Sequence, residues 1–233
     1  MLNGGVEMVV SEQLSYMLAE IAEQFAKDEP RFPLSGYVLF DNNFVYLTSR
    51  SRCVRFPFKY SGERFTTHVI NILGGEGVKE LYKEREQYHH ILKLWPAQFN
   101  YLFEGYNSFW DVPTEHLFQV WDDLLLETDG LLSTVKDPTQ IFTRFVGSPN
   151  GLQVEVVYSK RHKAVWSLSN EPSKTAITVA VPRRKTFQAL LTCDPPTVSV
   201  ALRQNHPRLL LTSESSGVQH VVTGFGDNNA TRH

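Results

Sequence analysis

Long apolar runs and targeting signals are absent from the sequence. No apolar run approaches the roughly 18 to 20 residues that are needed to span a bilayer. The amino terminus has no basic region followed by an apolar core, so we expect no secretory signal. These absences predict an intracellular protein, cytoplasmic or nuclear, that is not secreted and has no membrane partner.

Cysteine is scarce and the charges nearly cancel. The two cysteines, Cys53 and Cys193, form no metal-type pair, so we expect reduced thiols in a cytosolic protein. The 23 lysines and arginines oppose 25 aspartates and glutamates, which gives a formal net charge of -2. This balance argues against a generally basic nucleic-acid binder, but it leaves room for a local basic face.

What the sequence does contain is typical of a globular protein with mixed secondary structure. Of its 233 residues, 42% are hydrophobic and 21% are charged, which suits one large domain or two small ones. Leu14 and Leu18 recur with other apolar residues at three- and four-residue steps, which predicts an amphipathic helix over residues 11–27. A second such helix is predicted over residues 114–127. Both helices carry carboxylates on the face opposite the apolar one.

Strands are predicted in two series. Residues 37–40 and 44–47 flank Asp41-Asn42-Asn43, which predicts a hairpin. A helix is expected at residues 78–94 and a short helix at residues 186–191, and the aromatic segment 97–110 suggests a strand plus a connector between two halves. The other expected strands are residues 6–10, 53–58, 66–73, 140–146, 152–158, 164–168, 176–181, 197–203, 208–213 and 219–225.

The most direct hint of chemistry is the stretch at residues 69–81. There an expected strand runs through Gly74, Gly75 and Gly77 into an expected helix, which is also the layout of a phosphate-binding turn. A P-loop needs Gly-Lys-Ser/Thr, whereas Gly77 is followed by Val-Lys with no hydroxyl. A dinucleotide fingerprint would need a third glycine that is missing here. We therefore expect a tight turn, and a small nucleotide-binding enzyme remains an alternative.

Other groups that resemble catalytic or metal sites have simpler interpretations. His89 and His90 are adjacent, and neighbours on a helix diverge by roughly 100°, so the two do not suit one tetrahedral metal site. Asp122, Asp123 and Glu127 lie opposite the apolar face of their helix, which is typical of a solvated surface. We therefore predict no catalytic residue, no metal site and no cofactor.

Basic side chains form the most suggestive functional pattern. Phosphate-backbone binding requires positive charge without any readout of sequence. The alternative is that these groups lie on solvated loops and helix faces. The candidate DNA-binding residues are Lys79, Lys83, Arg85, Lys93, Arg161, Lys163, Arg183, Arg184 and Lys185.

The order of helices and strands nearly repeats, and in this two-half pattern the sequence resembles the DNA sliding clamps. Phage T4-type clamps are the most similar in length, and the eukaryotic and checkpoint clamps are more distant. The opening of a clamp's first domain is similar to the amino-terminal helix and residues 37–58, and that of its second domain to residues 115–125 and 142–159. The closing strands and helix of a clamp are similar to AITVAV (176–181), TFQALL (186–191), TVSVAL (197–202), RLLLTSE (208–214) and QHVVTGF (219–225).

This resemblance implies an α+β fold of two similar halves, residues 1–112 and 113–233, with antiparallel sheets and a few amphipathic helices. It also implies a non-enzymatic processivity factor or scaffold. Such a factor encircles DNA as a homo- or hetero-oligomeric ring, and it tethers partners such as a polymerase or replication factors. Its inner helices should be basic, whereas the helices at 11–27 and 114–127 are acidic. The alternative is an assembly adaptor with no DNA role.

Overall fold

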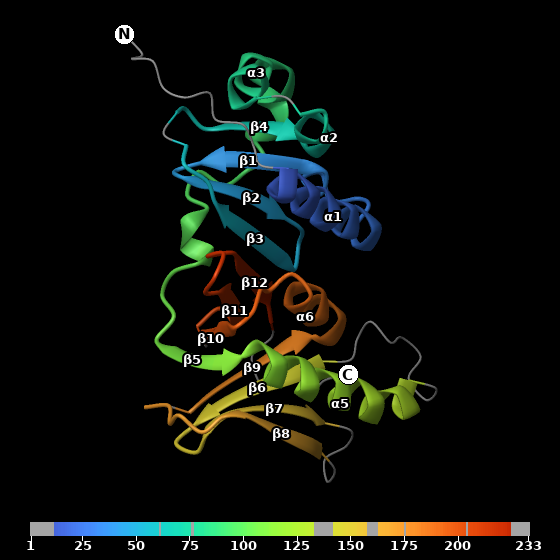
Figure 1. The fold of residues 1–233 in the computed structure, drawn as a ribbon, viewed down its shortest axis with the longest axis vertical. Coiled ribbons are helices and arrows are strands. Elements are labelled where there is room, and N and C mark those ends of the chain that lie inside the picture. The colour runs from blue at the N-terminus through green and yellow to red at the C-terminus, as the bar shows by residue number, and fades with distance from the viewer. Residues whose placement is uncertain are drawn as a thin grey trace. The chain divides into compact units, whose positions relative to one another are not determined.

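The chain has an α+β fold with antiparallel sheets and several helices, as predicted (Figure 1). The computed structural model describes residues 12–60, 62–75, 77–132, 142–157, 163–174, 176–203 and 205–224. The chain divides into two compact units, Met1–Phe99 and Asn100–His233. The expected boundary between two clamp-like halves, residues 1–112 and 113–233, stays a prediction. The expected strand at residues 6–10 lies outside the described residues.

The first unit is built on four antiparallel strands and one long helix. The strands run in the order β4-β1-β2-β3, and α1 covers one side of them (Figure 1). The predicted helix is confirmed, and Leu18, Ile21 and Phe25 form its buried face. The bounds are α1 (Glu12–Asp28), β1 (Tyr37–Asp41), β2 (Phe44–Thr48), β3 (Arg52–Pro57) and β4 (Phe65–His68).

The turn between β1 and β2 confirms the predicted hairpin. Asn42 and Asn43 have φ angles of 47° and 64°, so both lie in the left-handed region. Two-residue hairpin turns require this backbone conformation, and asparagine tolerates it better than most residues. The register that follows pairs Asp41 with Phe44 and Leu39 with Tyr46.

The predicted strand over residues 66–73 is wrong in its second half. The strand β4 ends at His68, and α2 (Val69–Leu73) begins at once. His68 caps this helix, because its Nδ1 accepts a hydrogen bond from the backbone N–H of Ile70 at 3.3 Å. Short apolar runs do not distinguish strands from helices by periodicity alone, and here the local cap accompanies the helix.

The single helix predicted over residues 78–94 is also wrong. The chain forms α3 (Val78–Lys83), the 3₁₀ turn η1 (Arg85–Tyr88) and α4 (His89–Leu92). The Tyr82 carbonyl, which a continuous helix would pair with the N–H four residues later, accepts from the Arg85 guanidinium at 3.1 Å. The basic residues of this segment therefore do not share one continuous helical face.

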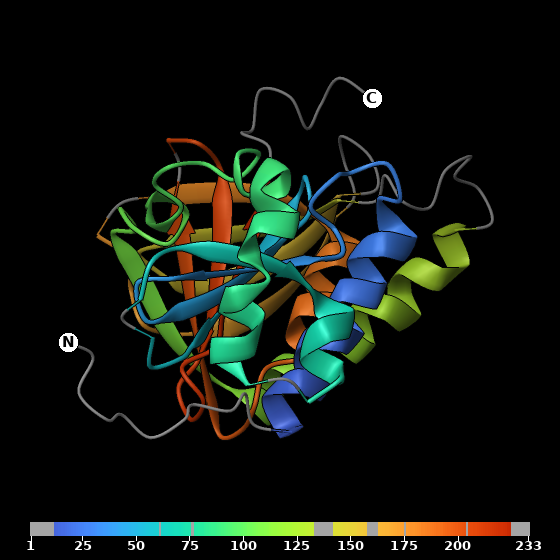
Figure 2. The same cartoon turned by 90° about the horizontal axis from the view of Figure 1, so that it is seen from above.

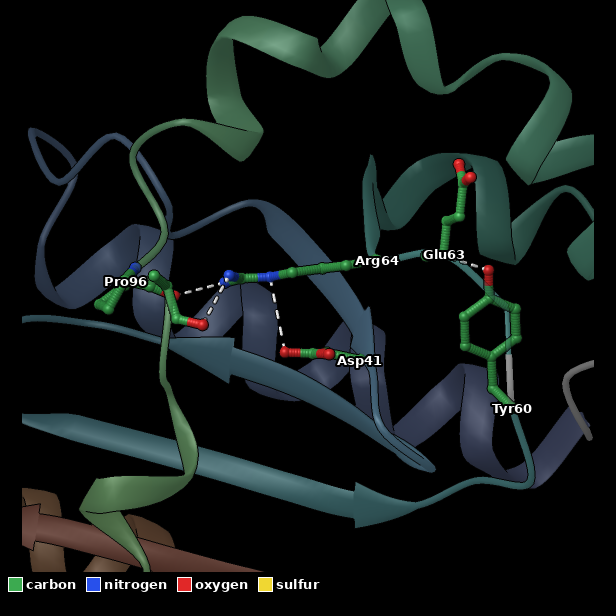
Figure 3. A network of polar contacts seen from close by, with 6 residues as sticks. Asp41, Tyr60, Glu63, Arg64 and Pro96 are labelled. Carbon is green, nitrogen blue, oxygen red and sulfur yellow. Dashed lines mark hydrogen bonds and ion pairs between the residues drawn. The ribbon is translucent and has the colours of Figure 1, made fainter.

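A polar network fixes the end of the first unit (Figure 3). Arg64 donates to the carbonyls of Pro96 and Ala97 at 2.6 and 3.2 Å, and its Nε lies 3.5 Å from an Asp41 carboxylate oxygen. Beside it, the Tyr60 hydroxyl donates to the Glu63 carbonyl at 2.6 Å. Burial raises the pKa of Asp41 above its ordinary value, and the Arg64 charge opposes that rise.

We expect Arg64→Met to destabilise the protein by about 1–3 kcal/mol at pH 7, because it removes two hydrogen bonds and the partner of a partly buried carboxylate. The pKa of Asp41 should rise further, so the cost should shrink as the pH falls and Asp41 is protonated. Urea unfolding at pH 7 and pH 4 measures both effects. Arg50→Met, at an exposed arginine of the same unit, is the matched control. An equal loss in the two variants would contradict the role of Arg64.

The second unit combines two antiparallel sheets with two helices. One sheet has the strand order β12-β11-β10-β5 within this unit, and the other has the order β8-β7-β6-β9. The segment 97–110 contains the 3₁₀ turn η2 (Asn100–Leu102) and the start of β5. The bounds are β5 (Ser108–Pro113), α5 (Thr114–Leu132), β6 (Phe142–Ser148), β7 (Gly151–Val157), β8 (Lys163–Ser169), β9 (Ile177–Pro182), α6 (Arg183–Leu190), β10 (Thr197–Arg203), β11 (Arg208–Ser213) and β12 (Gln219–Thr223).

Both sheets and both helices of this unit share one hydrophobic core. Trp110 from β5, Trp121 from α5 and Phe145 from β6 are among its most buried side chains. The helices α5 and α6 lie side by side (Figures 1 and 2), and Arg183 on α6 donates a hydrogen bond to the Thr128 hydroxyl on α5. The shared core makes the sheets and helices one packed body, which holds the start of α6 in a fixed place.

Candidate nucleic-acid interface

The start of α6 gathers three of the predicted DNA-binding residues. Arg183, Arg184 and Lys185 form its first turn, which contains no acidic residue. The residue before them, Pro182, has an extended backbone and provides no side-chain cap. The first turn of a helix carries a partial positive charge and normally favours carboxylates. Three cations at this position therefore create a local positive potential that suits an anion such as phosphate.

The three cations differ in their surroundings. Arg183 is half-buried and is held by its hydrogen bond to Thr128, so it fixes the start of α6 against α5. Arg184 is exposed, whereas Lys185, like Arg183, is half-buried. Arg184 is therefore the side chain of this turn that an external ligand reaches most readily, with Lys185 next to it in the chain.

Lys163, at the start of β8, is engaged within its own sheet. Its Nζ lies 2.6 Å from a carboxylate oxygen of Glu155 on β7, whose side chain is only 10% exposed. A partly buried carboxylate needs such a partner, so much of the Lys163 charge is compensated. Arg161, the neighbouring candidate, lies outside the described residues.

The four candidates of the first unit are interleaved with carboxylates. Lys79 and Lys93 are exposed, whereas Lys83 lies 3.4 Å from Glu80. Arg85 lies over the Tyr82 ring at 4.1 Å and 3.8 Å from Glu86. Surface ion pairs of this kind are weak, but they reduce the net positive potential of the segment. Of the described candidates, those on α6 have the fewest neighbouring acids in their own turn. The assignment of all nine residues to DNA stays a prediction.

The groups that suggested other chemistry are exposed side chains on helices. Asp122, Asp123 and Glu127 are all exposed on α5, as their position opposite the apolar face predicted. His89 and His90 are exposed as well. Within the described ranges, no group of three histidine, cysteine, aspartate or glutamate side chains is placed to hold a metal ion. In the same part of the chain, no helix is long and apolar enough to cross a membrane.

The glycine turn does not have the layout of a phosphate loop. A phosphate loop joins a strand to a helix, whereas Gly74 and Gly75 follow α2, and Gly77 precedes α3. Gly75 has a φ of 77°, which explains why glycine is used there. The turn therefore connects two short helices, and the strand–loop–helix layout that suggested a nucleotide site is not formed here.

Sequence reasoning missed one surface feature, a groove between α1 and α2 in the first unit. Tyr16 from α1 and Ile70 and Leu73 from α2 line it and are exposed. The incorrect strand at residues 66–73 hid the amphipathic character of α2. Val69 and Ile72, which are three residues apart, are both buried, as on one face of a helix. This spacing is the signal that could have predicted α2 and the exposure of its other face.

The fold matches solved bacterial sliding clamps over nearly its whole length. The beta subunit of DNA polymerase from Streptococcus pyogenes gives a TM-score of 0.62 at 13% identity, covering 97% of this chain and 69% of that chain. The Caulobacter crescentus beta sliding clamp gives 0.61 at 10% identity, covering 97% and 66%. The Helicobacter pylori beta clamp bound to a DNA ligase peptide gives 0.59 at 12% identity, covering 93% and 64%.

These comparisons establish the sliding-clamp fold. The chain spans about two thirds of the length of the clamps that it matches. At 10–13% identity the likeness extends to the fold alone. No protein-family model and no curated protein matches the sequence.

Proposed function

We propose that this protein is a non-enzymatic, sliding-clamp-like processivity factor or scaffold that holds duplex DNA and tethers partner proteins. The observation that carries the proposal is the match to beta clamps over 97% of the chain. The cationic first turn of α6 supports it, because such a turn can bind phosphates. The more specific likeness to phage T4-type clamps stays a prediction.

The proposed mechanism is topological. A ring closed around DNA needs only contacts to the phosphate backbone, which are nonspecific and weaken with salt. Arg184 and Lys185 would supply such contacts, with the remaining predicted basic residues in support. We propose that ring closure involves further copies of the chain or a second subunit. A homo- or hetero-oligomer is therefore part of the proposal.

The proposed partners are replication proteins inside the cell, such as a polymerase. One matching clamp is described with a bound DNA ligase peptide, which shows that a protein of this fold can bind a partner segment. By that analogy, we propose that the present chain tethers partners by short segments as well. No cofactor, metal or membrane enters this mechanism.

The second candidate function is an assembly adaptor without a DNA role. The observation that favours it is the acidic character of two helices, which a DNA-facing surface should not show. Glu20 and Glu23 are exposed on α1, and Asp122 and Asp123 are exposed on α5. Carboxylates on these faces would repel phosphates. DNA binding therefore separates the two functions.

The deciding experiment measures oligomeric mass and DNA affinity together. Sedimentation of the purified protein is expected to show an oligomer. Binding to a fluorescent duplex should weaken steeply as the salt rises from about 50 to 200 mM. A closed circular duplex should retain the protein longer than a linear one, since it has no free ends. A monomer that shows no DNA affinity at low salt would sink the clamp proposal and leave the adaptor.

A further inference from the structure

The groove between α1 and α2 is a candidate docking surface on the first unit. It has a volume of about 540 Å³, and residues of both helices line it. Gly36 and His68 complete it, next to the point where β4 passes into α2.

Large apolar side chains gather at this groove and remain exposed. Tyr16, Ile70 and Leu73 are 64%, 65% and 45% exposed. Single exposed apolar residues are common, whereas a group of them around a hollow marks an interaction site more often. Two of the three belong to α2, whose other face, Val69 and Ile72, is buried in the first unit. The helix α2 therefore packs on the first unit through one face, while Ile70 and Leu73 stay exposed at the groove.

The charge of the groove indicates what chemistry it accepts. Glu20 and Glu23 line it, and none of its described lining residues is a lysine or arginine. Glu23 has a partner in Lys27 at 2.7 Å, but both side chains are largely exposed, so this pair is weak. Burial lowers the pKa of His68 below its ordinary value, which favours the neutral ring. The groove is thus apolar with an acidic wall.

We infer that this groove docks a segment of a partner protein that carries apolar residues next to lysine or arginine. The apolar side chains would cover Ile70 and Leu73, and the basic group would meet Glu20. A nucleic acid does not fit, because its phosphates would face carboxylates. A second copy fits poorly in a symmetric pairing of two grooves, since both would bring the carboxylates of Glu20 and Glu23 and neither would bring a lysine or arginine to the interface. The inference deepens the proposed tethering of partners and does not depend on DNA binding.

A random 12-residue peptide library displayed on phage provides the probe, with the full-length protein as the target. We expect the enriched peptides to combine at least two large apolar residues with a net positive charge. Counter-selection against an Ile70→Ser/Leu73→Ser variant keeps only peptides that need the groove. One enriched peptide is then synthesised with a fluorescent label, and its Kd is measured by anisotropy.

The variants have matched controls outside the groove. Ile70→Ser/Leu73→Ser should weaken the peptide by about tenfold or more, because two apolar contacts are lost. Glu20→Lys should weaken it by about fivefold at low salt and by less at high salt. Leu94→Ser and Glu86→Lys, at exposed positions of the same unit that do not line the groove, should leave the Kd unchanged. All five positions are exposed, so the variants should remain folded.

Three results would overturn the inference. One is a selection that yields no groove-dependent peptide, or yields acidic ones. Another is a Kd that Ile70→Ser/Leu73→Ser leaves unchanged. The third is a sedimentation experiment in which the groove variants alone abolish self-association, which would make a second copy the occupant. A variant with Arg184 and Lys185 replaced should lose DNA and keep the peptide, so failure of the DNA proposal remains distinguishable.

Discussion

Replacing Arg184 and Lys185 by glutamine is expected to lower the affinity for duplex DNA by about 10- to 100-fold at 0.1 M salt. Each lost phosphate contact reduces the steepness of log K against log salt by about 0.9. Two lost contacts therefore lower the binding constant by roughly 60-fold at 0.1 M salt. The slope of log K against log salt should fall by about 2. Fluorescence anisotropy with one duplex at several salt concentrations measures both quantities.

The matched control removes the same net charge elsewhere. Lys83→Gln/Arg85→Gln also changes the net charge by two, but those residues lie near Glu80 and Glu86. We expect the control to weaken DNA binding by less than about threefold, because those cations are already compensated locally. Equal losses in the two double variants would mean that only total charge matters, and would exclude α6 as the contact.

Stability should move in the opposite direction from binding. Cations in the first turn of α6 oppose the helix dipole, so removing two of them should leave the free energy of unfolding unchanged or raise it by a few tenths of a kcal/mol. Urea unfolding of the same double variant measures this quantity. If the two cations form a binding site at some cost to stability, DNA affinity should fall while the free energy of unfolding is unchanged or rises. If the two side chains have a structural role, both quantities should fall.

The parts of the fold that followed the sequence were those with strong local signals. The helix α1 has apolar residues at helical spacing, and the β1–β2 hairpin has asparagines that tolerate positive φ. The strands β10 and β11 have the predicted bounds, Thr197–Arg203 and Arg208–Ser213. Both runs are rich in apolar residues and are followed directly by polar ones. In each case the local preference agrees with the tertiary packing.

The wrong predictions came from contacts that single-sequence patterns do not encode. The run Val69–Leu73 has high strand propensity, yet it forms α2, and the His68 side chain caps the helix start. The helix breaks after α3, where the Arg85 guanidinium donates a hydrogen bond to the Tyr82 carbonyl. Both contacts depend on where a neighbouring side chain lies, so the sequence pattern favoured a longer strand and a longer helix.

The candidate site was predictable only as a set of charges. The sequence identified the basic residues and predicted a short helix at residues 186–191, whereas α6 begins three residues earlier and includes Arg183–Lys185 in its first turn. It did not indicate that Lys163 would neutralise Glu155 across neighbouring strands. The availability of a charged group depends on partners that are distant in sequence. This is why the structure separates candidates that the sequence treated alike.

The largest expected effect on stability is that of Trp110→Ala. The indole is 1% exposed in the core of the second unit, and its Nε1 donates to the Glu171 carbonyl at 2.8 Å. Loss of such a side chain leaves a cavity and should cost about 3–5 kcal/mol. Phe109→Ala, on the same strand but 58% exposed, should change stability by less than about 0.5 kcal/mol. Guanidinium unfolding followed by circular dichroism measures both variants. A cost below about 1 kcal/mol at Trp110 would contradict the packing described here.

The neighbour of Trp110 makes this prediction more specific. A Cβ added at Gly147 would lie 2.5 Å from Cη2 of the indole, so Gly147→Ala alone should cost about 1–3 kcal/mol through overpacking. In a Trp110→Phe background the two indole atoms nearest this Cβ are absent and only Ile177 Cγ2, at 2.8 Å, remains close, so the added methyl should cost less. The double variant should therefore be more stable than the sum of the single changes predicts, by about 1 kcal/mol or more. Strict additivity would show that the indole and Gly147 do not touch, and the cavity argument for Trp110 would lose its geometric basis.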